Sequence, residues 1–258
     1  MRILDLDLDF FLNDIAHECN VWSNNRIEEG YFIPWSETDV IKFLEDHCGL
    51  KRSKKTSGRL FTFHHEVFNF LRDYNLFSNS ETKFDIDHID AHSDLGFTDS
   101  SSLLICTDLL AKKPEERYYP KCDRDDSNLS PGNFIAYLIA CRLVRMVNFV
   151  THPIWNGDLT WPIFHNFDEK SELIEMRRYS REDFVKLIGF YSREDIRLVE
   201  PISIEPAVPF KIIDCQDFYN SQPYDYIFLT QSPSFTPASS DRLIPIIMEY
   251  INDVSDSF

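Results

Sequence analysis

The chain has 258 residues, 43% of them hydrophobic, and a formal net charge of −17. A chain of this length and composition can bury the core of one large domain, so we expect a single domain over residues 1–258. The negative charge disfavours nucleic acid and anionic membranes as partners and favours a cationic ligand or divalent metal ions. The motifs GxGxxG, GxxxxGK(S/T) and GxSxG are missing, which argues against a dinucleotide site, a P-loop and a serine-hydrolase elbow.

The six cysteines are scattered and form no CxxC pair. Because the strand-like pattern begins at Met1, we expect that the chain has no signal peptide. Together with the scattered cysteines, this predicts reduced thiols and a cytoplasmic location. The most apolar long segment, residues 134–150, is interrupted by Arg142 and Arg145. We therefore expect no membrane span.

The first element is predicted from the stretch MRILDLDLDFFLND. Polar and apolar residues alternate with a period of two, which is typical of a strand, so Asp5, Asp7 and Asp9 share one face. A solvated acidic edge strand would explain this face, but the strand runs directly into Phe10 and Phe11. Buried carboxylates on one face repel each other unless a cation lies between them, so a metal site is the alternative.

A helix is expected over residues 35–50, with Ser36 as its N-cap and Gly49 at its end. The pattern then predicts a basic loop over residues 51–58, a strand over 59–63 and a turn leading into a helix over 64–75. A strand ending in a polar turn is expected over residues 83–97, and an irregular segment over 108–129.

The second half continues the alternation of helices and strands. A helix is expected over residues 130–150, and a shorter one over residues 179–191 begins with the capping pair Ser180 and Asp183. Strands are expected over residues 195–204 and 224–232, and a closing helix over residues 239–251. This alternation predicts a three-layer α/β/α fold with a mainly parallel sheet.

Three groups of reactive residues fall where predicted strands end. Asp7 and Asp9 end the first strand, and two further groups end the second and third strands: His64 and His65, then Asp90, His92 and Asp94. Because ligands of parallel α/β sheets bind at the carboxyl ends of the strands, we expect these groups to form one site.

The alternating Asp90, His92 and Asp94 can all face one pocket. Carboxylate oxygen combined with imidazole suits Mn²⁺, Fe²⁺ or Zn²⁺, whereas Ca²⁺ avoids nitrogen. With Asp7, Asp9 and one of His64 and His65, the donors exceed what a single tetrahedral ion needs. They fit two ions about 3.5 Å apart that share carboxylates.

The segments DLDLDFF, HHEV and DAHSD resemble motifs of the arginase/deacetylase superfamily, and DAHSD resembles its ureohydrolase branch most specifically. The start of the chain is similar to a branch whose characterised members are peptide arginases of ribosomal natural-product pathways. GNF (132–134), PIW (153–155) and SPSFTP (232–237) also resemble that branch. In ordinary arginases the DxD strand follows DAHxD, so the resemblance implies an arginase-like fold with a rearranged strand order.

The resemblance implies a single ureohydrolase-like catalytic domain with two Mn²⁺ ions, although Fe²⁺ or Zn²⁺ would also fit. It would hydrolyse arginine residues of a precursor peptide to ornithine and urea. The implied metal ligands are Asp7, Asp9, one of His64 and His65, Asp90, His92 and Asp94, with Asp5 behind them. We favour His64 over His65, because it directly ends the strand.

The resemblance also implies roles around the metal ions. Asp94 would pass a proton to the departing amine. Glu66 is a candidate to hold the guanidinium group, with an ordinary first-turn helix acid as the alternative. The histidine-glycine motif of the family's proton shuttle has no counterpart, so His88 and His152 are candidates for that role, with a structural role favoured for each. Substrate-binding candidates are Asn133, Trp155 and Ser232; from the residues alone, Asn133 could be a helix cap and Ser232 a turn former.

Three other functions would use the same residues differently. A single-zinc deacetylase or amidohydrolase would leave several carboxylates unused. A phosphatase built on the first DxD would need a threonine or valine where the chain has Phe11. A non-catalytic metal-stabilised binding protein would hold metal without turnover. The sequence predicts neither the oligomeric state nor the sequence of the peptide.

Overall fold

The computed structural model describes residues 1–17, 19–20, 22–78, 80–96, 99–120, 128–188 and 199–254. Within them, one eight-stranded sheet has the order β10-β2-β9-β1-β3-β4-β8-β5, and only β5 is antiparallel to its neighbour. Its strands are β1 (Arg2–Asp7), β2 (Thr56–Phe61), β3 (Phe84–Asp90), β4 (Val144–Thr151), β5 (Leu173–Ile174), β8 (Val208–Asp214), β9 (Tyr226–Thr230) and β10 (Ile251–Asp253). A separate pair comprises β6 (Arg177–Arg178) and β7 (Ser203–Ile204).

The α-helices are α1 (Glu37–Lys42), α2 (His65–Ser78), α3 (Asp99–Leu103), α4 (Phe134–Ala140), α5 (Arg181–Ile188) and α7 (Ile244–Met248). Two π-helical segments are Phe43–His47 and Leu104–Leu109. Short 3₁₀ turns are Leu8–Phe11, Pro114–Glu116, Pro131–Asn133, Trp161–Ile163, His165–Phe167, Glu169–Ser171, Pro233–Phe235 and Ala238–Leu243.

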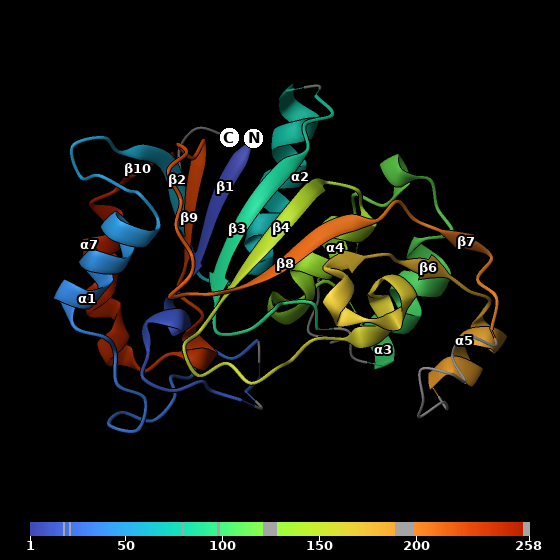
Figure 1. The fold of residues 1–258 in the computed structure, drawn as a ribbon, viewed down its shortest axis with the longest axis horizontal. Helices are drawn as coiled ribbons and strands as arrows, with labels where there is room; N and C mark the ends of the chain where they lie inside the picture. The colour runs from blue at the N-terminus through green and yellow to red at the C-terminus, as the bar shows by residue number, and fades with distance from the viewer. Residues whose placement is uncertain are drawn as a thin grey trace.

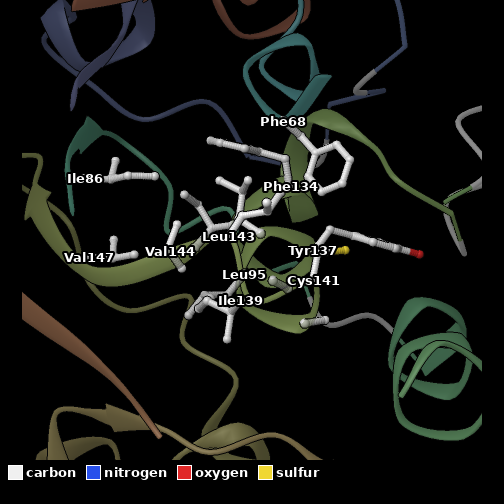
Figure 2. Packing of buried hydrophobic residues seen from close by; sticks show 14 of the residues in the cluster. Phe68, Ile86, Leu95, Phe134, Tyr137, Ile139, Cys141, Leu143, Val144 and Val147 are labelled. Carbon is white, nitrogen blue, oxygen red and sulfur yellow. The ribbon is translucent and has the colours of Figure 1, made fainter. Parts of the chain in front are cut away.

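Two hydrophobic clusters lie on opposite faces of the sheet. One is formed with α1 and α7, and the other with α2 and α4 (Figure 1). Figure 2 shows Phe68 of α2 and Phe134 of α4 among the buried residues of the second cluster. The predicted three-layer α/β/α fold with a mainly parallel sheet is therefore confirmed.

Alternation along β1 distributes its side chains between these layers. Leu4 and Leu6 enter the α1/α7 cluster, whereas Ile3 enters the α2/α4 cluster. Asp5 lies on the same side as Ile3 and is fully buried. The strand ends at Asp7, and a 3₁₀ turn carries the chain onward, so Asp9 follows the strand instead of belonging to it.

The prediction of one helix over residues 130–150 was wrong. Only Phe134–Ala140 is α-helical; Arg142 then adopts a positive φ of 55°, and the chain continues as β4. A continuous apolar run does not distinguish a buried helix from a buried strand by periodicity. The valines of its second half, at 144, 147 and 150, favour a strand.

Other boundaries also differ from the predictions. β2 already begins at Thr56, inside the expected basic loop, and β8 and β10 were not predicted. In the strand expected over 195–204, residues 195–198 lie outside the described part, and the described remainder pairs only at Ser203–Ile204. Residues 189–191 of the helix expected over 179–191 also lie outside it.

The capping predictions were confirmed. The Ser36 and Ser180 hydroxyls accept hydrogen bonds from the backbone N–H groups of Asp39 and Asp183. Gly49 follows the first helix with a φ of 69°.

The five cysteines within the described part are free thiols; Cys122 lies outside it. In the same part, no helix has the length and apolar character that a membrane crossing requires.

Candidate metal centre

The order of the central strands brings the predicted site residues together. β2, β9, β1 and β3 are consecutive and parallel, so their carboxyl ends lie at one edge of the sheet. His64 follows β2, Ser232 follows β9, Asp9 follows β1, and Asp90 ends β3. Residues from distant parts of the sequence therefore meet because their strands are neighbours.

Three carboxylates surround one nitrogen of His64. Its Nδ1 lies 3.0 Å from Asp7 Oδ2, 3.1 Å from Asp90 Oδ2 and 2.9 Å from Asp94 Oδ2. Its Nε2 lies 3.0 Å from Asp5 Oδ2. We call His64, Asp7, Asp90 and Asp94 the His64 set.

A second group forms around His92. Its Nδ1 lies 3.0 Å from Asp9 Oδ2 and 3.6 Å from Asp90 Oδ1, while its Nε2 lies 2.9 Å from the carbonyl oxygen of Ala16. We call His92, Asp9 and Asp90 the His92 set. Asp90 belongs to both sets and directs one oxygen toward each histidine.

The outer nitrogens of both histidines fix the ring orientations. When Nε2–H of His64 donates to Asp5, and Nε2–H of His92 donates to Ala16, the lone pairs of both Nδ1 atoms point at carboxylates. A lone pair facing carboxylate oxygens is repulsive, so a proton or a metal ion must lie between them. This is the arrangement of a ligating histidine held by a partner behind it.

The donor set and its spacing fit a metal ion. Ligands bound about 2.1 Å from an ion in octahedral geometry lie about 3.0 Å from each other, close to the distances around His64 Nδ1. Within the described residues, Asp90 Oδ2 and Asp94 Oδ2 are buried without a hydrogen-bond partner. The ion pairs of these carboxylates in that part of the chain involve only histidines. The buried cluster can therefore hold a metal ion.

The pKa shifts of the cluster without metal show that its carboxylates carry more negative charge than the histidines balance. Burial and the charge of Asp90 raise the pKa of Asp94 to about 7, and burial with neighbouring carboxylates raises the pKa of Asp9 well above its ordinary range. Burial alone would lower the pKa of His64 and of His92, but the adjacent carboxylates outweigh it and raise both. Protons therefore occupy the cluster where a metal ion can replace them.

A cavity of about 190 Å³ lies over the two sets. Its lining residues are Asp7, Asp9, His64, Asp90, His92, Asp94, Gly96, Pro131, Gly132, Asp158, Ser232 and Phe235. Glycine is required at position 96, because a Cβ atom there would lie 1.9 Å from the carbonyl oxygen of Gly132. This close approach joins the turn after Asp94 to the start of the α4 segment.

Ser232 lies beside the His64 set and donates a hydrogen bond from its hydroxyl to Asp7 Oδ2. It does so from a left-handed backbone conformation, with a φ of 44°. Its N–H donates to the carbonyl oxygen of Thr62, and its own carbonyl accepts from Thr236 Oγ1. Such a conformation in a non-glycine residue costs about 1–2 kcal/mol, and the surrounding hydrogen bonds maintain it.

Removing the Ser232 hydroxyl should weaken metal binding without unfolding the protein. We expect Ser232→Ala and Ser232→Gly each to lower Mn²⁺ affinity by about 10–100-fold, because Asp7 loses the donor that orients it. The glycine variant should be more stable than the alanine variant by about 1 kcal/mol without metal, since glycine adopts positive φ freely. Metal titration and urea unfolding with a chelator measure the two effects; wild-type affinity in Ser232→Ala would contradict the assigned contact.

His65 and Glu66 lie outside the cluster. The ring of His65 packs against those of Trp22 and Phe63, so of the two candidate histidines the fold brings His64 into the site. The Glu66 carboxylate accepts hydrogen bonds from the N–H groups of Thr62 and Phe63 and lines a different pocket. Its contact with a guanidinium group stays a prediction, and in the fold its carboxylate caps the start of α2.

Three other candidates, His88, Asn133 and His152, make contacts of their own within the fold. His88 is fully buried, contacts Asp5 Oδ2 at 2.8 Å, lies 3.5 Å from Asp90 Oδ2 and does not line the cavity. Asn133 uses its side chain within its own turn, accepting from Ser130 N and donating to Asn128 O. His152 is bonded through Nε2 to the carbonyl oxygen of Leu12.

Trp155 lies outside the lining and donates from Nε1 to Asp158, which does line the cavity. Sequence reasoning missed Asp158 and Phe235. Asp158 follows Gly157 in a loop after β4, and Phe235 lies in the SPSFTP segment. The sequence signals for these two loops were the PIW segment, which lies just before Asp158, and the SPSFTP segment, which contains Phe235.

The chain matches no protein-family model, and no curated protein matches it. The nature of the site is therefore inferred from its residues: a buried cluster of aspartates and histidines, at the carboxyl edge of a parallel sheet, that can hold a metal ion.

Proposed function

We propose that the chain is a hydrolase that holds two Mn²⁺ ions and converts arginine residues of a peptide into ornithine with release of urea. The observation that supports this most is the pair of donor sets joined through Asp90. One carboxylate that directs separate oxygens toward two histidine-containing sets is suited to bridge two ions. The mixture of imidazole with several carboxylates fits Mn²⁺, and Fe²⁺ or Zn²⁺ are also compatible.

The size and charge of the cavity support a single cationic side chain as its occupant. Its volume of about 190 Å³ is below the roughly 300–1,000 Å³ of pockets that enclose a whole drug-sized ligand. Five of its lining residues are aspartates, one negative charge more than two divalent ions would neutralise, so a positively charged group is favoured over an anionic one. An arginine side chain entering from a peptide bound outside satisfies both conditions.

The reaction needs no covalent intermediate with the protein. When bound, the two ions would supply an acidified water at neutral pH. Asp94 lines the cavity, and its Oδ2 is buried without a hydrogen-bond partner among the described residues. We assign it the transfer of a proton to the departing amine. Asp5 and Ser232 would keep His64 and Asp7 oriented while this occurs.

The proposal is tested by incubating Mn²⁺-loaded protein with an arginine-containing peptide and, separately, with free arginine. We expect urea release and the peptide mass change that corresponds to replacing a guanidinium group by an amine. The Asp90→Asn variant is the negative control, because it removes the shared carboxylate. Turnover of free arginine alone would reject the peptide substrate, and no turnover of either by protein with two bound ions would reject guanidinium hydrolysis.

A further inference from the structure

We propose that Asp158 makes the metal-loaded cavity select a guanidinium side chain over a neutral one of the same shape. This inference rests on the proposed function, since it assumes that two divalent ions occupy the two sets. Asp158 is the only carboxylate of the cavity lining, as the described residues define it, that belongs to neither set.

The charges of the lining give Asp158 this role. Asp7, Asp9, Asp90 and Asp94 carry four negative charges, and two divalent ions would neutralise them. The side chains and the ions of the loaded floor are then formally neutral together. The carboxylate of Asp158 is the remaining charged side chain that an entering guanidinium would meet.

The carboxylate of Asp158 is held in place before any ligand arrives. Its Oδ2 accepts a hydrogen bond of 2.7 Å from the backbone N–H of Ser93, and its Oδ1 accepts one of 3.0 Å from Trp155 Nε1. Ser93 is 1% exposed and lies between His92 and Asp94. Each carboxylate oxygen can accept a further hydrogen bond, so the group can still pair with a planar guanidinium. Its fixed orientation lowers the entropy cost of binding.

The position of Asp158 fits the mouth of the cavity. Its side chain is exposed, whereas the four aspartates of the two sets are buried. Phe235 lines the same cavity, is half-buried, and has its ring 5.0 Å from that of His92. A carboxylate and an aromatic ring in one lining favour a guanidinium group, which can pair with the first and stack on the second.

The test compares two peptides that differ only in carrying arginine or its neutral isostere citrulline. Their binding to Mn²⁺-loaded protein is measured by calorimetry, with metal content determined for every variant. We expect wild type to prefer the arginine peptide by at least about tenfold, the effect of roughly 1.4 kcal/mol. Asp158→Asn should lose that preference by weakening only the arginine peptide, with both metal ions retained.

Two further variants separate charge recognition from loop structure. Asp217→Asn removes an equal charge from an exposed position outside the lining and should retain the preference. Trp155→Phe removes one donor to Asp158 but keeps its charge, so most of the preference should remain. Equal weakening of both peptides by Asp158→Asn, or no weakening, would overturn the proposal.

Failure of this inference is distinguishable from failure of the proposed function. If wild type prefers the arginine peptide through Asp158 but releases no urea, hydrolysis is rejected and the cation contact stands. If wild type releases urea and Asp158→Asn keeps the full preference, hydrolysis stands and the role of Asp158 is rejected.

Discussion

Replacing His64 by glutamine should remove metal from the His64 set and lower hydrolysis of an arginine peptide by more than about a hundredfold. Replacing its neighbour His65 by glutamine should leave metal content and activity near those of wild type. The reason is geometric: His64 Nδ1 lies within 3.1 Å of three carboxylate oxygens, whereas the His65 ring packs on Trp22 and Phe63. The two variants change the same residue type at adjacent positions, so each controls for the other.

Metal content per folded protein and the initial rate of urea release are the measurements. A histidine with several carboxylates at hydrogen-bonding distance loses its role when an amide replaces the ring, because the amide cannot place a nitrogen lone pair at the same point. Loss of metal in His65→Gln with retention in His64→Gln would contradict the site described here. Equal retention in both would show that His64 is not a ligand.

The positions of the clustered aspartates and histidines along the chain could be predicted because they follow from the period of a strand. Alternation in the first strand places the aspartates of positions 5 and 7 on one face, and the alternation of Asp90, His92 and Asp94 begins where β3 ends. In a parallel sheet, the strand ends lie at one edge, so the sequence could place these groups on the same edge. Their proximity depends on the strand order β2-β9-β1-β3, which the sequence did not predict.

The contacts of individual side chains were harder to predict than their positions. His64 was favoured over His65 from its place after the strand, and the direction of the chain as it enters α2 separates the two in the fold. Glu66 was a candidate to hold the substrate because of its position beside the histidines, and an ordinary acid in the first helical turn was the alternative. In the fold its carboxylate instead satisfies free N–H groups of Thr62 and Phe63. Asn133 likewise satisfies its own turn.

The segment 130–150 was mispredicted because burial removes the signal on which periodicity depends. α4 and β4 are both apolar on most of their surface, and the turn between them lacks a glycine or proline. Arg142 instead takes the left-handed conformation. Asp158 was missed for a different reason, because its place in the cavity lining depends on a contact with Ser93, 65 positions earlier.

Mn²⁺ should stabilise the protein more strongly as pH rises from about 7 to about 8.5. In the metal-free protein, the carboxylates around His64 and His92 outweigh burial and raise the pKa of both well above 6.5. In that pH range the folded state therefore binds more protons than the unfolded chain, and its stability falls as pH increases. Burial and the charge of Asp90 raise the pKa of Asp94 to about 7. Asp94 therefore also lowers the stability of the folded state as pH rises, beginning at about pH 4.

Groups with the opposite shift do not interfere in this range. For Asp5 and Asp90, burial is outweighed by the neighbouring histidines and the pKa is lowered. The stability that these two contribute is lost only as pH falls below about 4. Burial lowers the pKa of His65 and of His152, so their contribution is already complete above about 6.5.

A metal ion reverses the pH dependence because it takes the place of these protons. The thermal midpoint with chelator should fall across this range, while a fixed Mn²⁺ concentration, about a hundred times its Kd at pH 7, should raise the midpoint by about 5–10 °C at that pH. The difference should grow with pH, since fewer protons have to leave the cluster when the ion binds. Thermal scans with Mn²⁺ and with chelator at each pH measure this difference, and Ser232→Ala should show a smaller one. A difference that stays constant or shrinks would mean that the cluster does not exchange protons for metal, and the histidines would then be ion-paired partners of the aspartates and not ligands.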